Sequence, residues 1–481
     1  MTRHEFIKGM AAVAALSGCK SRECGSATGG RCASKRWYKG NLHTHTMWSD
    51  GKAFPEEAVA WYKSRGYNFL GLSDHNLFQE DTDRWTEVIG DADRYEMPKN
   101  TGTLGYRYQP FVRRSYFDDY VLAFPDAALR TNAAGRTEAR LRTFDELSAR
   151  FNAAGEFLLV PDIEATRSIK YADGRLQQMH MNYVNVPKLP PSFLDKGFNR
   201  IVNDIPQRDF LAAHQKEVAA LAKSMSLQHP FILNHPIWTW YDVGPEVLVD
   251  NPEVRFFEVC NNGSPHASAK GLPSDGLDTD RLWDVVNAFR VRRGQPLLYG
   301  IGTDDTHRYR GEPGDMLMPG NAWSLVRAAS LDAASLISAM CAGDFVTCEG
   351  LEPDDVSFCP STGTLTVSAP AGLSVRTVNF IVTKRDFSEK PVRTVSIEPP
   401  DAPEEKRKIY ARKVNVYDTK KIGCVAKAVS GGIGEAVKAS YTMKPDDLYV
   451  RARIISPERP AASAFQHPKV QVAWTQPYVR A

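Results

Sequence analysis

The 481-residue sequence has few cysteines, no long apolar run and no block of like charge. Its eight cysteines do not show the CxxC spacing of structural zinc sites. No stretch reaches the roughly 20 apolar residues that a transmembrane helix needs. The 60 basic and 57 acidic residues nearly balance, and no basic run is long enough to indicate a nucleic-acid-binding surface. A G-x-S-x-G motif and a P-loop are also missing, so neither chemistry is suggested.

The N-terminus resembles an export signal. A short charged start, "MTRHEFIKG", precedes a short apolar run that ends in "LSGC" at Cys19. This pattern resembles a bacterial lipoprotein signal over residues 1–19, with Cys19 as the lipidated residue. The stretch "TRHEFIK" also resembles the twin-arginine export motif, except that His4 replaces the second arginine, so the export route stays open. We expect an exported protein, lipid-anchored to a bacterial membrane on its periplasmic or cell-surface side, with residues 20–35 as a flexible tether.

Strand-like and helix-like patterns alternate between residues 36 and 349. Helices are expected to begin at Pro55 and after Thr143, and apolar strands such as "GLSDHN" and "YGIGTDDTH" end in polar residues. This alternation predicts an α/β fold with a parallel sheet or barrel, whose active site would lie at the carboxyl ends of the strands. Residues 79–142 interrupt the rhythm, and we expect a long irregular insertion near the site. Residues 350–481 alternate like strands and predict a C-terminal all-β sandwich.

Histidines and acids recur at the ends of the predicted strands. His43 and His45 point to the same side of one strand because side chains alternate, and two imidazoles on one face can bind a metal ion. Further candidates follow along the chain: Asp50, Asp74, His75, Glu164, His180, His235, Asp304, Asp305 and His307. Imidazole and carboxylate together suit Zn²⁺, Mn²⁺ or Fe²⁺. The residues alone leave open whether Asp304 or Asp305 is the ligand.

These motifs together resemble the PHP family, named for polymerases and histidinol phosphatases. The resemblance is carried by "NLHTHTMWSDG", "GLSDHN", "LLVPDIEA", "MHMNYVNV", "ILNHP" and "YGIGTDDTH", from about residue 38 to residue 310. It implies a distorted, TIM-like (β/α)7 barrel and a metal-dependent phosphoesterase with two or three divalent metal ions.

The resemblance also implies a role for each candidate ligand. His43, His45 and Asp305 would hold a first metal, and Glu164 would bridge it to a second one held by His180 and His235. Asp50, His75 and His307 would hold a third metal. The family spacing Asp-x-His selects Asp305 over Asp304. Glu164, Asp305 and His307 are the candidate catalytic residues.

The substrate is expected to be a small phosphate ester, with a lipid anchor as the protein's contact with the membrane and no nucleic-acid partner. Candidate substrate-binding residues are Arg167, Trp238 and Glu258, and the basic pair Arg113 and Arg114 could grip a phosphate or form a solvated surface. Two alternative functions remain open. The metals could hydrolyse a carbon-centred bond, or the protein could be a non-catalytic cell-surface binding module.

Overall fold

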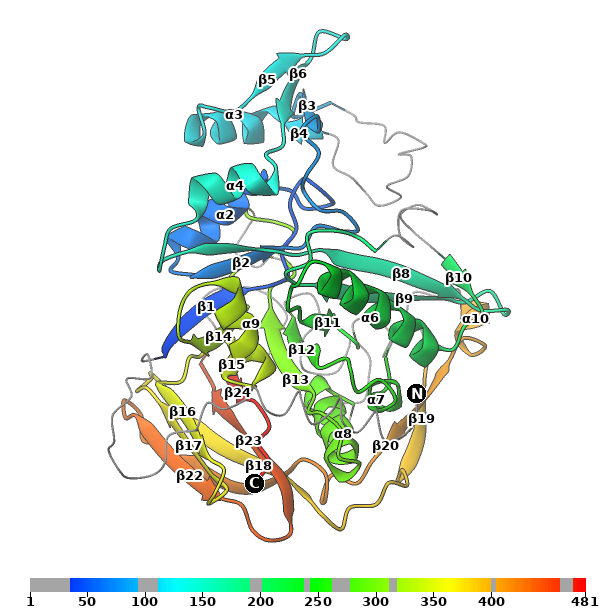
Figure 1. The fold of residues 1–481 in the computed structure, drawn as a ribbon, viewed down its shortest axis with the longest axis vertical. Coiled ribbons are helices and arrows are strands. Elements are labelled where there is room, and N and C mark those ends of the chain that lie inside the picture. The colour runs from blue at the N-terminus through cyan, green and yellow to red at the C-terminus, as the bar shows by residue number, and fades with distance from the viewer. Residues whose placement is uncertain are drawn as a thin grey trace. The chain divides into compact units, whose positions relative to one another are not determined.

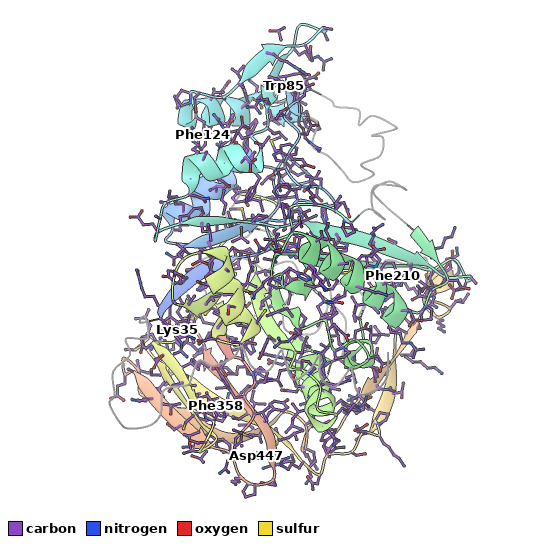
Figure 2. All side chains as sticks on the ribbon, viewed as in Figure 1. Lys35, Trp85, Phe124, Phe210, Phe358 and Asp447 are labelled. Atoms are coloured by element: carbon purple, nitrogen blue, oxygen red, sulfur yellow. The ribbon has the colours of Figure 1, made fainter. Side chains whose placement is uncertain are left out.

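The computed structural model describes residues 35–93, 111–190, 201–237, 243–261, 277–310, 318–398, 404–458 and 470–481, and Figure 2 shows their side chains from Lys35 onward. Lys35–Ala481 forms one compact unit. The predicted signal, Cys19 and most of the predicted tether lie outside the described residues, as does Trp238. None of the helices in the described ranges is long and apolar enough to cross a membrane.

The larger sheet has nine strands, and it includes both the first described strand, β1 (Arg36–Asn41), and the last one, β24 (Gln471–Thr475) (Figure 1). In spatial order the strands are β21 (Cys424–Ser430), β18 (Thr377–Lys384), β23 (Asp447–Ser456), β24, β15 (Phe345–Glu349), β14 (Ala322–Ala328), β1, β2 (Phe69–Leu72) and β7 (Leu158–Pro161). β1, β2 and β7 are parallel, and the other neighbours are antiparallel. All four residues of β2 are buried, as expected for a parallel strand covered on both faces.

A six-stranded sheet contains further pairs of parallel strands. Its order is β10 (Ile201–Asn203), β8 (Glu164–Lys170), β9 (Leu176–Tyr183), β11 (Phe231–Leu233), β12 (Phe256–Asn261) and β13 (Tyr299–Thr303). The parallel pairs are β10 with β8, β11 with β12 and β12 with β13, whereas β9 is antiparallel to both β8 and β11. Backbone hydrogen bonds join the two sheets, from Asn185 N–H after β9 to Pro161 O in β7 (2.6 Å) and from His45 N–H after β1 to Thr306 O after β13 (2.8 Å). The fold is therefore mixed α/β, and a closed (β/α)7 barrel stays a prediction.

Local sequence explains where two connecting helices begin. α2 (Pro55–Ser64) has proline at its first position, where the missing N–H costs no helical hydrogen bond. α4 (Phe144–Phe151) begins after Thr143, whose Oγ1 accepts from Glu146 N–H while the Glu146 carboxylate accepts from Thr143 N–H. Both predicted helix starts are confirmed. In the described ranges before residue 350, the other helices outside the insertion are α6 (Gln207–Ser224), α7 (Pro245–Val249), α8 (Thr279–Arg292) and α9 (Ala333–Cys341).

The described part of the insertion at residues 79–142 contains more regular secondary structure than expected. It holds a sheet of β4 (Phe111–Arg113), β3 (Trp85–Ile89), β6 (Thr137–Arg140) and β5 (Leu129–Thr131), together with helix α3 (Arg114–Ala123). Tyr120 of α3 stacks on Phe54, with ring centroids 3.6 Å apart, and donates to Glu56 Oε1 at 2.9 Å. The insertion therefore packs against the start of α2. Its strands are too short to give a clear periodic pattern in the sequence.

The described residues after 350 are mainly strands and loops, with the short helix α10 (Glu404–Arg407) as an unpredicted exception. A three-stranded sheet of β16 (Asp355–Cys359), β17 (Thr364–Ala369) and β22 (Val437–Thr442) contacts β18, β21 and β23. β19 (Arg393–Ile397) pairs with β20 (Arg412–Val416). Because β15 pairs directly with β24, the nine-stranded sheet continues across residue 350. The proposed domain boundary there stays a prediction.

Candidate metal centre

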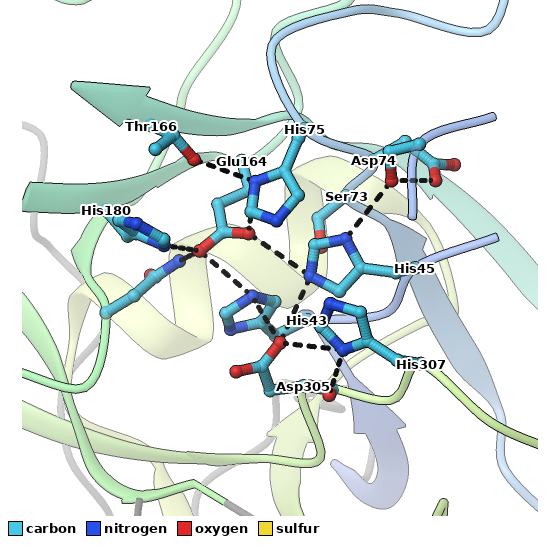
Figure 3. A network of polar contacts seen from close by, with 12 residues as sticks. His43, His45, Ser73, Asp74, His75, Glu164, Thr166, His180, Asp305 and His307 are labelled. Carbon is cyan, nitrogen blue, oxygen red and sulfur yellow. Dashed lines mark hydrogen bonds and ion pairs between the residues drawn. The ribbon is translucent and has the colours of Figure 1, made fainter. Parts of the chain in front are cut away.

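Most of the nine candidate ligands lie at or just beyond the ends of strands, and both sheets contribute. His43, His45 and Asp50 follow β1, His75 follows β2, Glu164 opens β8, His180 lies in β9, His235 follows β11, and Asp305 and His307 follow β13. Parallel backbone bridges join Thr44 to Thr306 and His75 to Glu164. These bridges hold strand ends side by side, and the structure brings the nine side chains into one cluster. Figure 3 labels all of them except Asp50 and His235.

Glu164 lies at the centre of this cluster, where its two carboxylate oxygens face different imidazoles (Figure 3). Oε1 lies 3.2 Å from His43 Nε2 and 3.0 Å from His180 Nδ1. Oε2 lies 3.1 Å from His45 Nε2 and 3.0 Å from His75 Nδ1. A carboxylate with separate nitrogen neighbours at each oxygen has the geometry to bridge two cations.

Three overlapping groups of side chains could each hold a cation, since their ligand atoms lie within 4.8 Å of one another. The groups are His43, His45, Glu164 and Asp305; His75, Glu164 and His180; and His45, Asp50, His75 and His307. The first group matches the set that the resemblance implies for the first metal. The second has His75 where the resemblance implies His235, and the third gains His45.

His235 lies at the edge of the cluster. Its Nε2 is 3.6 Å from Glu164 Oε1 and 3.9 Å from Asp305 Oδ2. Its backbone adopts a left-handed φ of 22°, and Asp305 has a φ of 49°. Such conformations are uncommon for residues with a side chain and are found at functional sites.

Neighbouring oxygens fix the direction of two imidazoles. His43 Nδ1 lies 2.6 Å from Glu258 Oε1, and His307 Nδ1 lies 2.9 Å from the main-chain oxygen of Asp305. Because these oxygens accept hydrogen bonds, Nδ1 of each ring is the donor and Nε2 is left for the cluster. His307 Nε2 lies 3.2 Å from Asp50 Oδ1. Metal-binding histidines are commonly oriented in this way.

Glu258 is a partner of His43 in the structure. Its Oε1 also accepts from Thr303 Oγ1 at 2.6 Å, and its Oε2 accepts from the His235 N–H and from Asn261 Nδ2, both at 2.8 Å. Four protein groups therefore surround this buried carboxylate. The substrate-binding role predicted for Glu258 has no support in these contacts.

Asp304 points away from the ligand groups and holds the turn that carries Asp305. Its carboxylate accepts from the backbone N–H groups of residues 320–322, from Asn41 Nδ2 and from Tyr62 Oη. Burial raises the pKa of Asp304 above its ordinary value. The ligand groups contain Asp305 and not Asp304, which agrees with the choice that the Asp-x-His spacing implies.

Asp74 has a similar supporting place. Its carboxylate accepts from the Thr46 N–H and Oγ1, from Ser49 Oγ and from Gln79 Nε2. These bonds fix the loop between His45 and Asp50, so Asp74 shapes the site without joining a ligand group.

The acids of the cluster are paired with histidines rather than with arginine or lysine. Among the described residues, every ion pair of Glu164, Asp305 and Asp50 is with an imidazole. Burial would raise the pKa of Glu164 and that of Asp305, but the charge of His43 helps to hold both pKa values well below the usual range. Both carboxylates are therefore ionised at neutral pH.

The imidazoles respond to this negative charge in different ways. Burial would lower the pKa of His45, but hydrogen bonds to Asp305 and Glu164 raise that pKa to about 10. Burial prevails at His180 and lowers its pKa to about 4. Protons on imidazoles thus balance part of the acidic charge, and bound cations would balance the same charge.

Unpartnered buried atoms show whether the cluster fits a metal. His43 Nε2, Glu164 Oε2 and Asp50 Oδ1 are buried, and in the part of the chain that the structure describes they face other candidate ligand atoms at 3.0–3.2 Å without a well-aligned hydrogen bond. A buried polar atom without a hydrogen bond is costly, and a coordinated cation would satisfy all three atoms. Since the donors are imidazole nitrogens and carboxylate oxygens, the cluster fits the predicted divalent cations.

Arg167 is predicted to bind substrate, but its place in β8 does not favour that role. Glu164 and Thr166 both contact His75, and side chains alternate along a strand. Arg167 therefore points to the opposite face, where its charge acts on Tyr183. The structure gives its predicted role no support.

Two asparagines of the cluster are not among the predicted site residues. Asn234 Nδ2 donates to Glu164 Oε1 at 2.9 Å and to Asn182 Oδ1 at 2.7 Å. Both residues stand in motifs that contain a candidate ligand, "NHP" and "MHMNYVNV". Their proximity to His235 and His180 in the sequence is the signal that could have found them.

No protein-family model matches the chain, and no curated protein matches it. One similar solved structure is a two-domain protein containing a predicted PHP-like metal-dependent phosphoesterase from Bacteroides vulgatus ATCC 8482. It is 14% identical, covers 88% of this chain and 100% of its own, and has a TM-score of 0.36. Because this similarity is low, support for a function has to come from the site itself.

Proposed function

We propose that this chain is a metal-dependent phosphoesterase that uses two or three divalent cations, Zn²⁺, Mn²⁺ or Fe²⁺. The observation that carries the proposal is the position of Glu164, whose two oxygens belong to two different sets of imidazoles. Cations bound side by side there would lower the pKa of water and neutralise charge on a phosphoryl group. The sequence resemblance to the PHP family directs the proposal toward a phosphatase or phosphodiesterase.

The protein's own residues would hold and orient the reacting groups. Glu164 and Asp305 provide ionised oxygens, and Glu258 turns His43 Nε2 toward them. The proposed ligands are His43, His45, Asp50, His75, Glu164, His180, His235, Asp305 and His307. Asp304 and Asp74 would keep the ligand-bearing loops in place.

A substrate would approach the cluster from the side of Asp50 and His307. Their side chains are 19% and 16% exposed, whereas those of His43 and His45 are fully buried. The phosphate ester would therefore meet His307 first, in keeping with the catalytic role predicted for it. Small esters suit this approach because most of the cluster is enclosed by protein.

We also propose that the protein is exported and lipid-anchored through Cys19, so that its substrates lie outside the cytoplasm. The N-terminal sequence supports this proposal. Mass spectrometry of the protein purified from membranes would test it. A mature chain that begins at acylated Cys19 is expected, and an intact Met1 on the mature protein would contradict it.

Metal analysis combined with ester hydrolysis tests the proposed activity. The purified protein should contain divalent metal and, with added Mn²⁺, should hydrolyse p-nitrophenyl phosphate or bis-p-nitrophenyl phosphate. Chelation should remove this activity, and added metal should restore it. Bound metal with turnover only of amides or lactones would favour the carbon-centred reaction. A protein that binds no metal would favour the binding module.

A further inference from the structure

Asn234 connects several parts of the metal cluster. Its Nδ2 donates to Glu164 Oε1 at 2.9 Å, and its backbone N–H donates to the His180 main-chain oxygen at 3.0 Å. The next residue in the chain is His235. Asn234 is buried, so these contacts are shielded from water. One residue therefore links three candidate ligands.

Asn182 determines which way the Asn234 amide faces. Asn234 Nδ2 donates to Asn182 Oδ1 at 2.7 Å, and Asn182 Nδ2 donates to the main-chain oxygen of Leu42 at 2.5 Å. Turning the Asn182 amide over would place its oxygen against the Leu42 oxygen. Turning the Asn234 amide over would place oxygen against Asn182 Oδ1 and the Glu164 carboxylate. The pair therefore has one orientation, with the Asn234 NH₂ group toward Glu164.

This orientation matters because the terminal torsion of a glutamate side chain has a broad energy minimum. Contacts with several imidazoles do not by themselves fix the plane of the carboxylate. The hydrogen bond from Asn234 holds Oε1 on the side of His43 and His180 and leaves Oε2 for His45 and His75.

We infer that Asn234 is a positioning residue that sets the orientation of the Glu164 carboxylate, with Asn182 holding Asn234 in turn. The inference rests on the proposed function, in which Glu164 bridges two cations. Asn234 acts through Glu164 and is not itself a ligand.

An amide suits this task because it donates a hydrogen bond without adding charge. Lysine or arginine at the same place would form an ion pair with Glu164 and compete with cations for its charge. Aspartate would place a second carboxylate against Oε1 and repel it. Asn234 thus positions the carboxylate and leaves its negative charge for the metals.

Mn²⁺ binding, followed by electron paramagnetic resonance, tests this inference without reference to esterase activity. The wild-type protein should bind at least two Mn²⁺ ions, with the spectrum of an exchange-coupled pair. Asn234→Ala should weaken binding of the second Mn²⁺ by about 10- to 100-fold and reduce the coupled signal. Asn182→Ala should shift both readouts in the same direction by about tenfold or less, and it provides the test if Asn234→Ala does not fold.

Asn251→Ala is the matched control. Asn251 is also buried, and its Nδ2 donates to the Val247 main-chain oxygen at 2.8 Å, so the variant loses a similar hydrogen bond outside the cluster. Its Mn²⁺ affinity and spectrum should equal those of the wild type. If folded Asn234→Ala and Asn182→Ala keep the wild-type Mn²⁺ affinity and the exchange-coupled signal, the inference is overturned and the proposed function is left standing. A wild-type protein with fewer than two bound Mn²⁺ ions would contradict the proposed function and the bridging role with it.

Discussion

Two buried groups of charged residues in this molecule are built in different ways. In one, Arg451 of β23 donates from Nε and Nη2 to the carboxylate of Asp284 in α8, at 2.8 and 2.7 Å, and its Nη2 lies 2.9 Å from Asp280. In the other, the carboxylates of Glu164 and Asp305 face imidazoles. Both groups are almost fully shielded from water.

The difference lies in how the negative charge is balanced. A guanidinium stays protonated at every physiological pH, so in the first group, the Arg451 group, Arg451 and Arg453 balance the charge of Asp280 and Asp284 and join α8 to the C-terminal strands. Imidazoles can lose their protons, and those around Glu164 can exchange them for cations. The buried acids beside arginine are therefore structural, whereas buried acids beside several histidines indicate a metal site.

The largest effect is expected from Glu164→Gln. This change removes one negative charge from the centre of the cluster while keeping the side-chain shape. We expect the loss of at least one bound cation and a fall in ester hydrolysis of at least about a hundredfold, since several kcal/mol of transition-state stabilisation depend on the metals. Metal analysis and steady-state kinetics on the folded variant measure both.

Glu56→Gln is the matched control for that change. Glu56 is an equally buried glutamate that accepts from Arg142 Nε at 2.7 Å and from Tyr120. Its variant should be less stable but should keep the wild-type metal content. Equal metal content in Glu164→Gln and the wild type would refute the bridging role.

Arg451→Met should break the structural group and leave the metal site unchanged. Removing the guanidinium leaves Asp284 without its main partner in a buried position, which typically costs about 3–5 kcal/mol of folding free energy. Urea unfolding would measure this loss. Metal content measured below the unfolding transition should match the wild type, and a loss of metal from the folded variant would show that the two groups are coupled.

The two groups should also contribute differently to the pH dependence of folding stability when metals are removed. Because the pKa of His45 is raised to about 10, its proton stabilises the metal-free fold fully below about pH 6.5. This stabilisation is lost as the pH rises toward 10, so the urea midpoint in chelator should fall across that interval. The Arg451 group should not change how the urea midpoint depends on pH over this interval. Replacing His45 with glutamine should reduce this slope without removing it, because the charges of Asp305 and Glu164 outweigh burial and also raise the pKa of His43. A wild-type midpoint that rises with pH would contradict this expectation.

The smallest effect is expected from Arg114→Ala in the insertion. Arg114 Nη1 lies 3.5 Å from Asp118 Oδ1 one turn along α3, and both side chains are about half exposed. Such a pair contributes about 0.3–0.5 kcal/mol. Thermal unfolding should therefore change little, and the Michaelis constant for a phosphate ester should stay the same. A large rise in that constant would instead indicate that Arg114 grips the phosphate.

Much of the cluster could be predicted because strand ends carry the candidate ligands. The period of the strands and the "HTH", "SDH" and "DDTH" motifs are enough to place His43, His45, His75 and Asp305 at the ends of strands. The structure divides these strands between two sheets, which the sequence pattern does not predict. The hydrogen-bond partners of Asp304 and the position of Asp305 beside His43 favour Asp305 as the ligand, and the local pattern of the chain does not contain these contacts.

Other features depend on contacts between distant parts of the chain. Glu258 reaches His43 across 215 positions, and β15 pairs with a distant strand, β24. The helical pattern predicts His214 at the surface of its helix, but this residue is buried and its Nδ1 donates to the Phe210 main-chain oxygen at 2.8 Å. Helical periodicity shows which residues share a face, while tertiary packing decides which face is covered.

A crystal soaked with Zn²⁺ and measured at the zinc absorption edge would test most directly whether Glu164 bridges two cations. We expect two or three anomalous peaks in the cluster, with separate peaks within about 2.2 Å of Oε1 and of Oε2 of Glu164. A fully soaked crystal without a peak at either oxygen would contradict the bridging role.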